Sequence, residues 1–207
     1  MEVNNKIDIL RSEDWKIEGY EMNLDESVKK FTEVFTLHGG HFYYLNSDEA
    51  KELLVKLISS YSSLMYAHLD SRTENLVKDL TIKQTVNLED RASDPNLKND
   101  VKTIEVGIGK ADALAAESGS LIFYDFDALK SYVAFLPEIN ITFASEDDLF
   151  PTVFDALGKF WSSTKRMPAC IQIVQSPSRT GDIEYKIIRP SHGPRELYAI
   201  LLKGDAP

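Results

Sequence analysis

The sequence contains a single cysteine, Cys170, among its 207 residues. One cysteine excludes a disulfide bond within the chain. It also excludes an iron–sulfur cluster or a cysteine-based zinc site built from this chain alone, because each needs several thiolate ligands. We therefore expect no cofactor and no metal in this chain, and we place any associated iron–sulfur cluster in a partner protein.

The chain also lacks a long apolar run and an excess of basic residues. No stretch approaches the roughly 20 apolar residues of a membrane-spanning helix, and the polar start MEVNNKIDILRSEDW has no apolar core of signal-peptide length. The 23 Lys and Arg residues against 33 Asp and Glu give a net charge of −10, which argues against a nucleic acid or an anionic membrane as partner. We expect a soluble, cytoplasmic protein without a membrane span.

What the sequence does have is an alternation of helix and strand patterns. Apolar residues at helical spacing predict helices in 25–38, 47–61, 73–80 and 147–163. Short apolar runs predict strands at 41–45, 64–69, 139–144, 169–174 and 196–202. This order is typical of an α/β fold with a mostly parallel sheet flanked by helices.

The length of the chain suits one sizeable domain. We expect a polar N-terminal arm at 1–23 and a single α/β domain at 24–207. The polar segment 81–103 is interpreted as a connection. Two apolar segments meet around Gly119, which predicts a hairpin or a kinked strand there.

Two short motifs give weak functional signals. GIGKAD (107–112) lacks the third glycine of a dinucleotide-binding loop, and no helix pattern follows it; two glycines in a twisted strand explain it more simply. His38 and His41 have a spacing that some metal sites use, but the glycines between them already serve as a helix stop. His68 lies in an apolar strand and is interpreted as a hydrogen-bonded core histidine.

Glu117 stands in an otherwise apolar context, AAESGSLI. A carboxylate is costly to bury there unless it is paired or takes part in chemistry. It is either the polar residue of a hairpin turn or a functional group, namely a general base, a nucleophile or the partner of an arginine. The residues alone leave both interpretations open.

The densest group of polar residues is SPSRTGDIE (176–184), directly after the strand expected at 169–174. Its arginine can bind a carboxylate or phosphate through two parallel hydrogen bonds, and neighbouring hydroxyls can complete the shell of the anion. Ligands of open α/β folds bind at the carboxyl ends of strands, which makes this segment a candidate ligand site. The alternative is a capped loop whose charges brace the fold. The candidate ligand-binding residues are Ser178, Arg179, Thr180, Asp182 and Glu184.

A second polar turn, His192-Gly193-Pro194, precedes the last strand. A histidine at this position can act as an acid, a base or a hydrogen-bond donor near neutral pH. It can equally hold its loop to Asp182 or Glu184. Spacing alone does not separate these roles, so His192 and Glu117 are both candidate catalytic residues.

Two regions of the sequence together resemble the LUD domain family, of the lactate-utilisation protein C and B type. In that family Ala-Asp-x-x-x-Ala-Glu-[Thr/Ser]-Gly-[Thr/Ser] precedes a strand, and Leu-Pro, Pro-Ser-[Lys/Arg]-Thr-x-Asp-Ile-Glu and His-Gly-Pro follow in that order. The resemblance covers about 105–202 well and 25–100 only in the order of helices and strands. The matching residues are Ala111-Asp112, Ala116 to Ser120, Leu136-Pro137, Pro177 to Thr180, Asp182 to Glu184 and His192 to Pro194.

The resemblance implies a three-layer α/β fold similar to the NagB/RpiA/CoA-transferase-like superfamily. It also implies a role beside iron–sulfur partner proteins in the oxidation of L-lactate to pyruvate, with a small carboxylate or related anion as ligand. Departures from the family pattern bear on the pocket, among them Ser176 in place of the glycine of Gly-Pro-Ser and RPSHGP in place of Gly-Val-His-Gly-Pro. Lys130 is the nearest cation where the family often has an arginine, and Tyr198 replaces a histidine that is common in the last strand.

The resemblance therefore predicts a LUD-type protein in which Arg179 binds a small anion at the strand ends, with Glu117 and His192 as proton-transfer groups. By analogy with related transferases, Glu117 is also a candidate nucleophile. Two other functions compete with this one. The chain is either a non-catalytic assembly or regulatory subunit, or a small-molecule transferase or ligase of the CoA-transferase-like superfamily.

Overall fold

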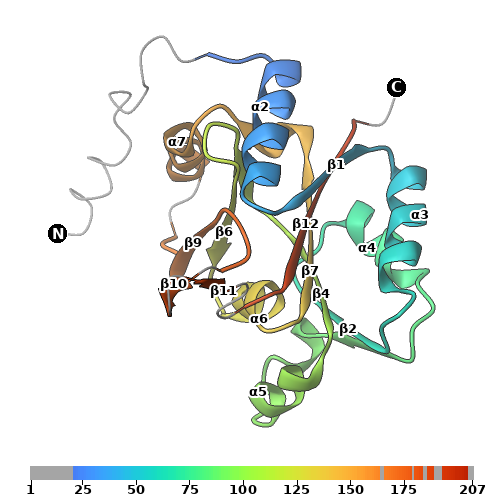
Figure 1. Ribbon diagram of the computed structural model, residues 1–207. Coiled ribbons are helices and arrows are strands. Elements are labelled where there is room, and N and C mark those ends of the chain that lie inside the picture. Colours follow the sequence, from blue (N-terminus) through green and yellow to red (C-terminus); the bar gives the residue numbers. More distant parts are fainter. Residues whose placement is uncertain (1–20, 164–165, 179, 184–185, 189–192, 205–207) are drawn as a thin grey trace, which may run out of the picture.

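A six-stranded sheet forms the centre of the protein (Figure 1). The computed structural model describes residues 21–163, 166–178, 180–183, 186–188 and 193–204. Every neighbouring pair of strands in this sheet is parallel, which confirms the predicted α/β fold with a mostly parallel sheet. In spatial order the strands are β1 (His41–Leu45), β12 (Glu196–Leu202), β7 (Ile139–Ser145), β4 (Val106–Lys110), β2 (Ser63–Tyr66) and β3 (Gln84–Asn87).

Helices cover both faces of this sheet. On one face, α3 (Ser47–Ile58) and α4 (Ser71–Lys78) bury their apolar residues against alternate strand residues such as Ile108 and Ile200. On the other face lie α2 (Leu24–Leu37), the short α5 (Leu97–Asp100) and α6 (Leu129–Phe135). Figure 1 shows α3 and α4 on one side of the sheet and α2 and α6 on the other. Because side chains alternate along a strand, a sheet buried on both faces needs apolar residues at nearly every position, as in ELYAILL of β12.

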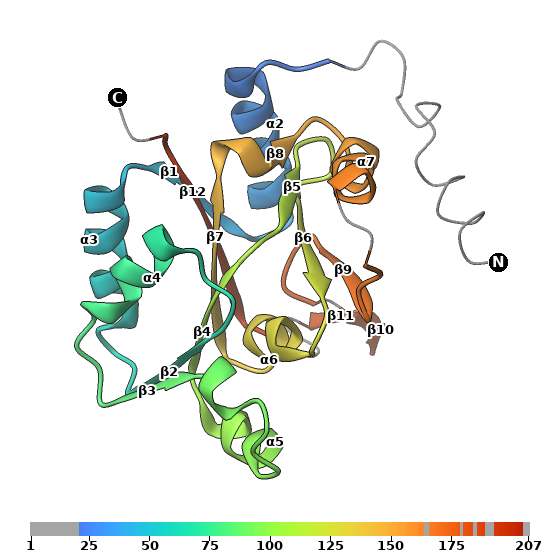
Figure 2. The same ribbon diagram turned by 180° about the vertical axis from the view of Figure 1, so that it is seen from behind.

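A second sheet packs on the α2 side of the first. It has four strands, and Figure 2 shows it from behind together with α7 (Val153–Ser163). One face contributes Leu114 and Leu121 to the core shared with α2, and the other buries Ile122 under α7. A separate antiparallel pair is formed by β10 (Thr180–Ile183) and β11 (Lys186–Ile188). In spatial order the four strands are β8 (Leu149–Phe150), β5 (Ala113–Ala115), β6 (Ser120–Asp125) and β9 (Cys170–Val174).

Several elements differ from the sequence-based expectation. The segment 81–103 contains β3, α5 and two short 3-10 turns, η2 (Glu89–Arg91) and η3 (Val101–Thr103), and is not a plain connection. The helix expected from 147 begins at Val153, because residues 146–148 form the 3-10 turn η4 (Glu146–Asp148) and β8 follows it. Thr152 and Asp155 then exchange hydrogen bonds, which starts the helix after Pro151.

Two helices begin within one residue of their predicted starts, and each follows an asparagine cap. The side chain of Asn23 accepts a hydrogen bond from the Glu26 backbone N–H, and Glu26 accepts one from Asn23 N–H in return. Asn46 and Glu49 form the same reciprocal pair at the start of α3. Each cap is thus an asparagine immediately before the observed start of its helix, and each stabilises its helix by about 1 kcal/mol.

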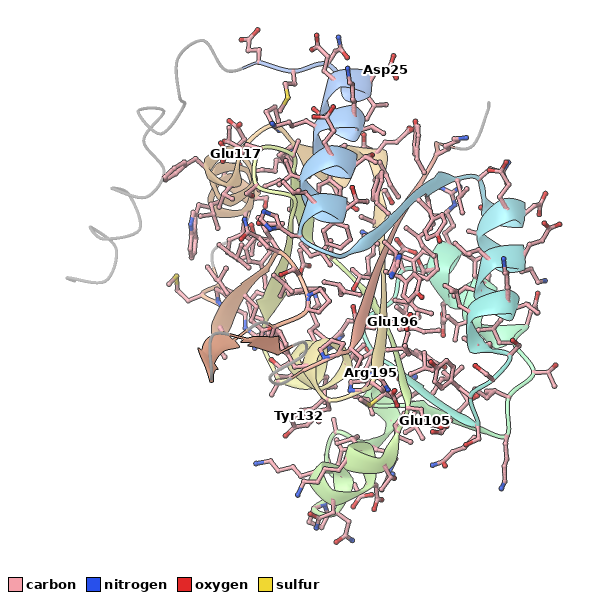
Figure 3. The ribbon with its side chains drawn as sticks, in the orientation of Figure 1. Asp25, Glu105, Glu117, Tyr132, Arg195 and Glu196 are labelled. Carbon is pink, nitrogen blue, oxygen red and sulfur yellow. The ribbon has the colours of Figure 1, made fainter. Side chains whose placement is uncertain are left out.

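At the amino edge of the large sheet, Glu105 joins the starts of β2 and β4. One carboxylate oxygen accepts hydrogen bonds from the backbone N–H of Ser62 at 2.8 Å and of Ser63 at 3.1 Å, and both hydroxyls also donate to it. The hydrogen bonds from Ser62, followed by those from Ser63, hold the pKa of Glu105 below its ordinary value although burial opposes this. Figure 3 shows Glu105 at the same end of the sheet as Arg195 and Glu196.

Replacing Glu105 with glutamine is expected to remove a stabilisation that depends on pH. A depressed pKa in the folded state contributes stability above the pKa of the unfolded chain, and this is lost as the pH falls through the folded value. The free energy of unfolding of the wild type should thus exceed that of E105Q at pH 7, and the gap should close between about pH 5 and pH 3. Urea denaturation across this range measures the gap. As a control, E52Q changes an exposed residue of α3 and should alter the free energy of unfolding at pH 7 by no more than about 0.5 kcal/mol.

Candidate functional site

The Glu117 carboxylate lies at the start of α7. Its Oε1 accepts a hydrogen bond from the backbone N–H of Val153 at 3.0 Å, and its own N–H donates to the carbonyl of Pro151 at 3.0 Å. Gly119 closes the β5–β6 hairpin with a φ of +59°, a conformation that glycine adopts without strain. Glu117 is thus the polar residue of the predicted hairpin turn and also caps a helix. Neither contact tests whether it takes part in chemistry.

The two sequence regions that resemble the LUD family meet at this hairpin. Strand β9 pairs antiparallel with β6, so that Leu121 lies opposite Val174. The side-chain amide of Gln175 then donates to the carbonyl of Ser118 at 2.9 Å. The polar segment that begins at Ser176 therefore starts beside the hairpin that carries Glu117.

The structure describes some of the predicted ligand-binding residues and not others. Ser178 is half-buried. Thr180 and Asp182 belong to β10, of which the backbone is described. Arg179, Glu184 and His192 lie outside the described residues. The ligand-binding and catalytic roles of these residues, Glu117 included, stay predictions.

Strand β9 does not lie in the large parallel sheet. This strand was expected in the parallel sheet, so that the segment after it would lie at the carboxyl edge where ligands bind. Instead β9 belongs to the four-stranded sheet and runs antiparallel to β6. An apolar run such as CIQIV predicts a strand, but it does not encode which sheet the strand joins.

The residues that follow His192 lie at the amino edge of the large sheet, where β12 begins. Gly193 has a φ of +72°. The backbone N–H of Arg195 donates to the carbonyl of Glu138 at 2.7 Å, and its guanidinium pairs with the Glu138 carboxylate at 2.6 Å. Figure 3 shows Arg195 and Glu117 well separated. The described part of this turn therefore does not join the Glu117 hairpin.

At the carboxyl edge of the large sheet, Lys110 ends β4 between two carboxylates. Its Nζ lies 2.9 Å from Asp148 Oδ2 and 3.6 Å from Asp70 Oδ2. Burial lowers the pKa of Lys110, but the hydrogen bond and charge of Asp148 and the charge of Asp70 raise it further, so the pKa lies above its ordinary value. Lys110 is therefore a half-buried, protonated ammonium. Sequence reasoning considered this motif for its glycines and overlooked its lysine.

A second ammonium–carboxylate pair lies close to the first in the fold. Lys130 Nζ is 2.6 Å from both carboxylate oxygens of Asp112, and Asp112 also accepts a hydrogen bond from the Tyr124 backbone N–H at 2.8 Å. Both residues were singled out separately, Asp112 in the family motif and Lys130 as the cation in place of an arginine. Their pairing was not foreseen, because 18 residues separate them in the sequence.

His68 follows β2 at the same edge. Its Nε2 lies 2.7 Å from Asp127 Oδ2 and its Nδ1 lies 3.2 Å from Glu89 Oε1. The predicted hydrogen bonding is present, but the side chain is 32% exposed and so is not a core histidine. The backbone of His68 has a φ of +51°, which is strained for a residue with a Cβ.

In the part of the chain that the structure describes, no three His, Cys, Asp or Glu side chains are grouped as metal ligands. Nor does any helix there have the length and apolar character needed to cross a membrane. Comparison with known proteins supplies the family. The family model of the LUD domain matches residues 28–202. This chain belongs to the LUD domain family.

Several curated relatives of this chain carry lactate-related names. Lactate utilization protein C 1 of Bacillus mycoides is 32% identical over 48% of this chain and 44% of its own length. Lactate utilization protein C of Shouchella clausii is 24% identical over 86% of this chain and 80% of its own length. The chain spans about half the length of some of the curated relatives that it matches: 44% of the Bacillus mycoides protein and 54% of lactate utilization protein C of Halalkalibacterium halodurans.

A solved structure agrees with the LUD fold. The crystal structure of a DUF162 family protein from Deinococcus radiodurans superposes with a TM-score of 0.65, covering 89% of this chain and all of the other. The two sequences are 15% identical, so this likeness supports the fold and not the activity.

Within this LUD domain, the capping role of Glu117 gives a direct prediction. The E117A variant should lower the free energy of unfolding by about 1 kcal/mol, because the Val153 N–H at the start of α7 loses its acceptor. E117Q should stay within about 0.5 kcal/mol of the wild type, since its side-chain oxygen can still accept that bond. Urea denaturation measures both values. Equal stability of all three proteins would show that the hydrogen bond does not support the helix.

Proposed function

We propose that this LUD protein takes part in the oxidation of L-lactate to pyruvate, beside iron–sulfur partner proteins that carry the electrons. The observation that supports the proposal most directly is the family match over 28–202 together with relatives named lactate utilization protein C. The single cysteine fits a division of labour in which clusters reside in partner chains. Cys170 is free and exposed, which suits a reducing compartment such as the cytoplasm.

The proposal includes a small carboxylate as ligand. The hairpin of Glu117 and the start of the 176–184 segment lie side by side through the Gln175–Ser118 hydrogen bond. This arrangement supports a site to which both motif regions contribute, with Arg179 as the group that binds the anion.

A genetic experiment tests the lactate role. Deleting the coding sequence in the source organism should abolish growth on L-lactate as sole carbon source and leave growth on glucose unchanged. A plasmid copy of the wild-type chain should restore growth, whereas R179A should not, although R179A should accumulate as a folded protein. Normal growth of the deletion strain on L-lactate would contradict the proposal.

One observation favours a second candidate, a non-catalytic assembly subunit. Glu117, the strongest candidate for chemistry among the described residues, already serves as a helix cap. Under this alternative, E117Q and R179A would both restore growth on lactate. The tagged chain would also co-purify with a cysteine-rich iron–sulfur protein and show no affinity for lactate or pyruvate by calorimetry.

A further inference from the structure

Strand β1 is an edge of the large sheet, and the described residues leave its outer side open to a further strand. The carbonyl of Leu45 accepts a hydrogen bond at 2.8 Å from the backbone N–H of Lys203, which directly follows β12. Successive residues of a strand direct their backbone groups to alternate sides, so Tyr43 faces β12 with Leu45, whereas Phe42 and Tyr44 face outward. Among the described residues, none is hydrogen-bonded to the backbone N–H or carbonyl of Phe42 or Tyr44.

This edge lacks the features that usually keep edge strands apart. The sequence of β1, HFYYL, contains no proline, no lysine and no acidic residue, and its register with β12 is regular along the whole strand. Its side chains after His41 are only half-buried. The other edge of the large sheet, β3, has the polar sequence QTVN. Strand β1 is therefore the edge that offers both unpaired backbone groups and apolar side chains.

A second copy of β1 matches the outward-facing residues of the first. In an antiparallel pair, residues that exchange both N–H···O bonds alternate with residues that exchange none. When Phe42 lies opposite Tyr44 of the second copy, Tyr44 lies opposite its Phe42, and each pair exchanges both bonds. Tyr43 then lies opposite Tyr43 on a two-fold axis. All three pairs are aromatic, and aromatic pairs across strands stabilise a sheet.

Antiparallel pairing of β1 would also bring the two α3 helices together. Helix α3 contacts both β1 and β12, and Figure 1 shows it on one side of β1 with α2 on the other. Neighbouring strands are about 4.8 Å apart, so two α3 helices that each lie over β1 and β12 would be about 10 Å apart, the distance of packed helices. The two helices would run antiparallel, as the strands do.

One flank of α3 packs beside α4, and the other faces the β1 edge. Ser47 Oγ accepts a hydrogen bond from Arg72 Nε at 3.0 Å, and Lys51 Nζ donates to Asp79 at 2.6 Å, both toward α4. Helix α4 leads from β2 to β3, on the side of α3 away from β1. The flank of α3 opposite Ser47 and Lys51 is therefore the one that would meet a second copy.

This outer flank of α3 is complementary to itself. It carries Glu49, Leu53 and Lys56, which are four and three residues apart and so are neighbours on one helix face. Glu49 lies in the first turn and Lys56 in the last, and Leu53 between them is half-buried. In an antiparallel pair of helices, Glu49 of each copy lies beside Lys56 of the other, and the two leucines meet at the centre. Charge and apolar contact thus both favour a second copy of this chain as the partner.

We infer that two copies of this chain associate through β1, antiparallel about a two-fold axis at Tyr43, to form a dimer with one continuous sheet. A symmetric dimer of this kind uses the same surface on both subunits. The inference concerns assembly and does not rest on the role in lactate oxidation. Sedimentation equilibrium of the full chain should give twice the monomer mass of 23.4 kDa, with dissociation on dilution.

A charge swap tests the contact between the α3 helices. E49K and K56E each place like charges at both ends of the α3 contact, and each should raise the dimer dissociation constant about tenfold. The E49K/K56E double variant restores opposite charges across the axis and should return to within about threefold of the wild type. Within one copy these residues are seven positions apart, so the recovery must come from contact between copies. E74K, the same charge change on α4, should dimerise like the wild type.

Disulfide crosslinking tests the register. The exposed Cys170 is first replaced as C170S. In that background Y43C should crosslink to itself on mild oxidation, because opposite residues without mutual hydrogen bonds have Cα atoms about 4.5 Å apart, which a disulfide can span. Q84C on the opposite edge strand β3 is the control and should stay uncrosslinked.

Three results would overturn the inference. The first is a wild-type chain that stays monomeric at about 100 μM. The second is a dimer whose dissociation constant neither E49K nor K56E changes. The third is crosslinking of Q84C at least as fast as that of Y43C. Sedimentation of the unmodified chain decides whether a dimer forms even if a variant does not fold.

Discussion

Replacing Gly107 with alanine is expected to destabilise the protein by about 3 kcal/mol or more. A Cβ at this position of β4 would lie 2.2 Å from the carbonyl oxygen of Val133 and 2.7 Å from Pro137 Cγ. The first contact is with the backbone of α6, which cannot move aside as the end of a flexible side chain can. The helix must therefore shift away from the sheet, and it would disturb the core around Met65 and Leu129.

Gly109, two residues along the same strand, provides the control. A Cβ there would lie 3.3 Å from Val133 Cγ1, a side-chain atom that can adjust. G109A should cost less than about 1 kcal/mol. Urea denaturation of both variants measures the difference, and a G107A protein that fails to fold would agree with the prediction. A G107A variant within about 0.5 kcal/mol of the wild type would contradict it.

These two glycines illustrate what the sequence could predict and what it could not. The absence of a third glycine in GIGKAD already made a nucleotide loop improbable and favoured a strand. The steric reason for Gly107 is a helix, α6, that was not predicted at all. Helix α6 begins shortly after the end of β6. Its seven residues are too few for helical periodicity to be distinguished from the apolar residues of the preceding strand.

The polar residues discussed as a candidate site were likewise predicted only in part. Local patterns identified the hairpin at Gly119 and the polar residue Glu117, because turns depend on residues close in sequence. The lysine–aspartate pairs at the carboxyl edge could not be found in this way. Lys110 and Asp148 are 38 residues apart, and their meeting depends on the order of strands in the sheet. Strand order is a property of the whole chain, and one sequence does not display it.

Replacing Asp125 with alanine is expected to lower the free energy of unfolding by about 3 kcal/mol. This carboxylate is 1% exposed. It accepts hydrogen bonds from the backbone N–H of Ala128 and of Ser131, each at 2.9 Å, and from the Ser131 hydroxyl. These donors lie just before α6 and in its first turn, and alanine would leave them without an acceptor in a part-buried position. The loss should be larger than at an exposed cap for that reason.

Hydrogen exchange would show where the damage lies. The amides of Tyr132 and Leu136, which are bonded within α6, should lose protection in D125A before the strands of the large sheet do. D125N should be less damaging, because one side-chain oxygen can still accept. D79A, which breaks an exposed pair with Lys51, should cost no more than about 0.5 kcal/mol. If D125A were as stable as D79A, the apolar residues of α6, such as Leu129 and Val133, would be sufficient to hold the helix in place.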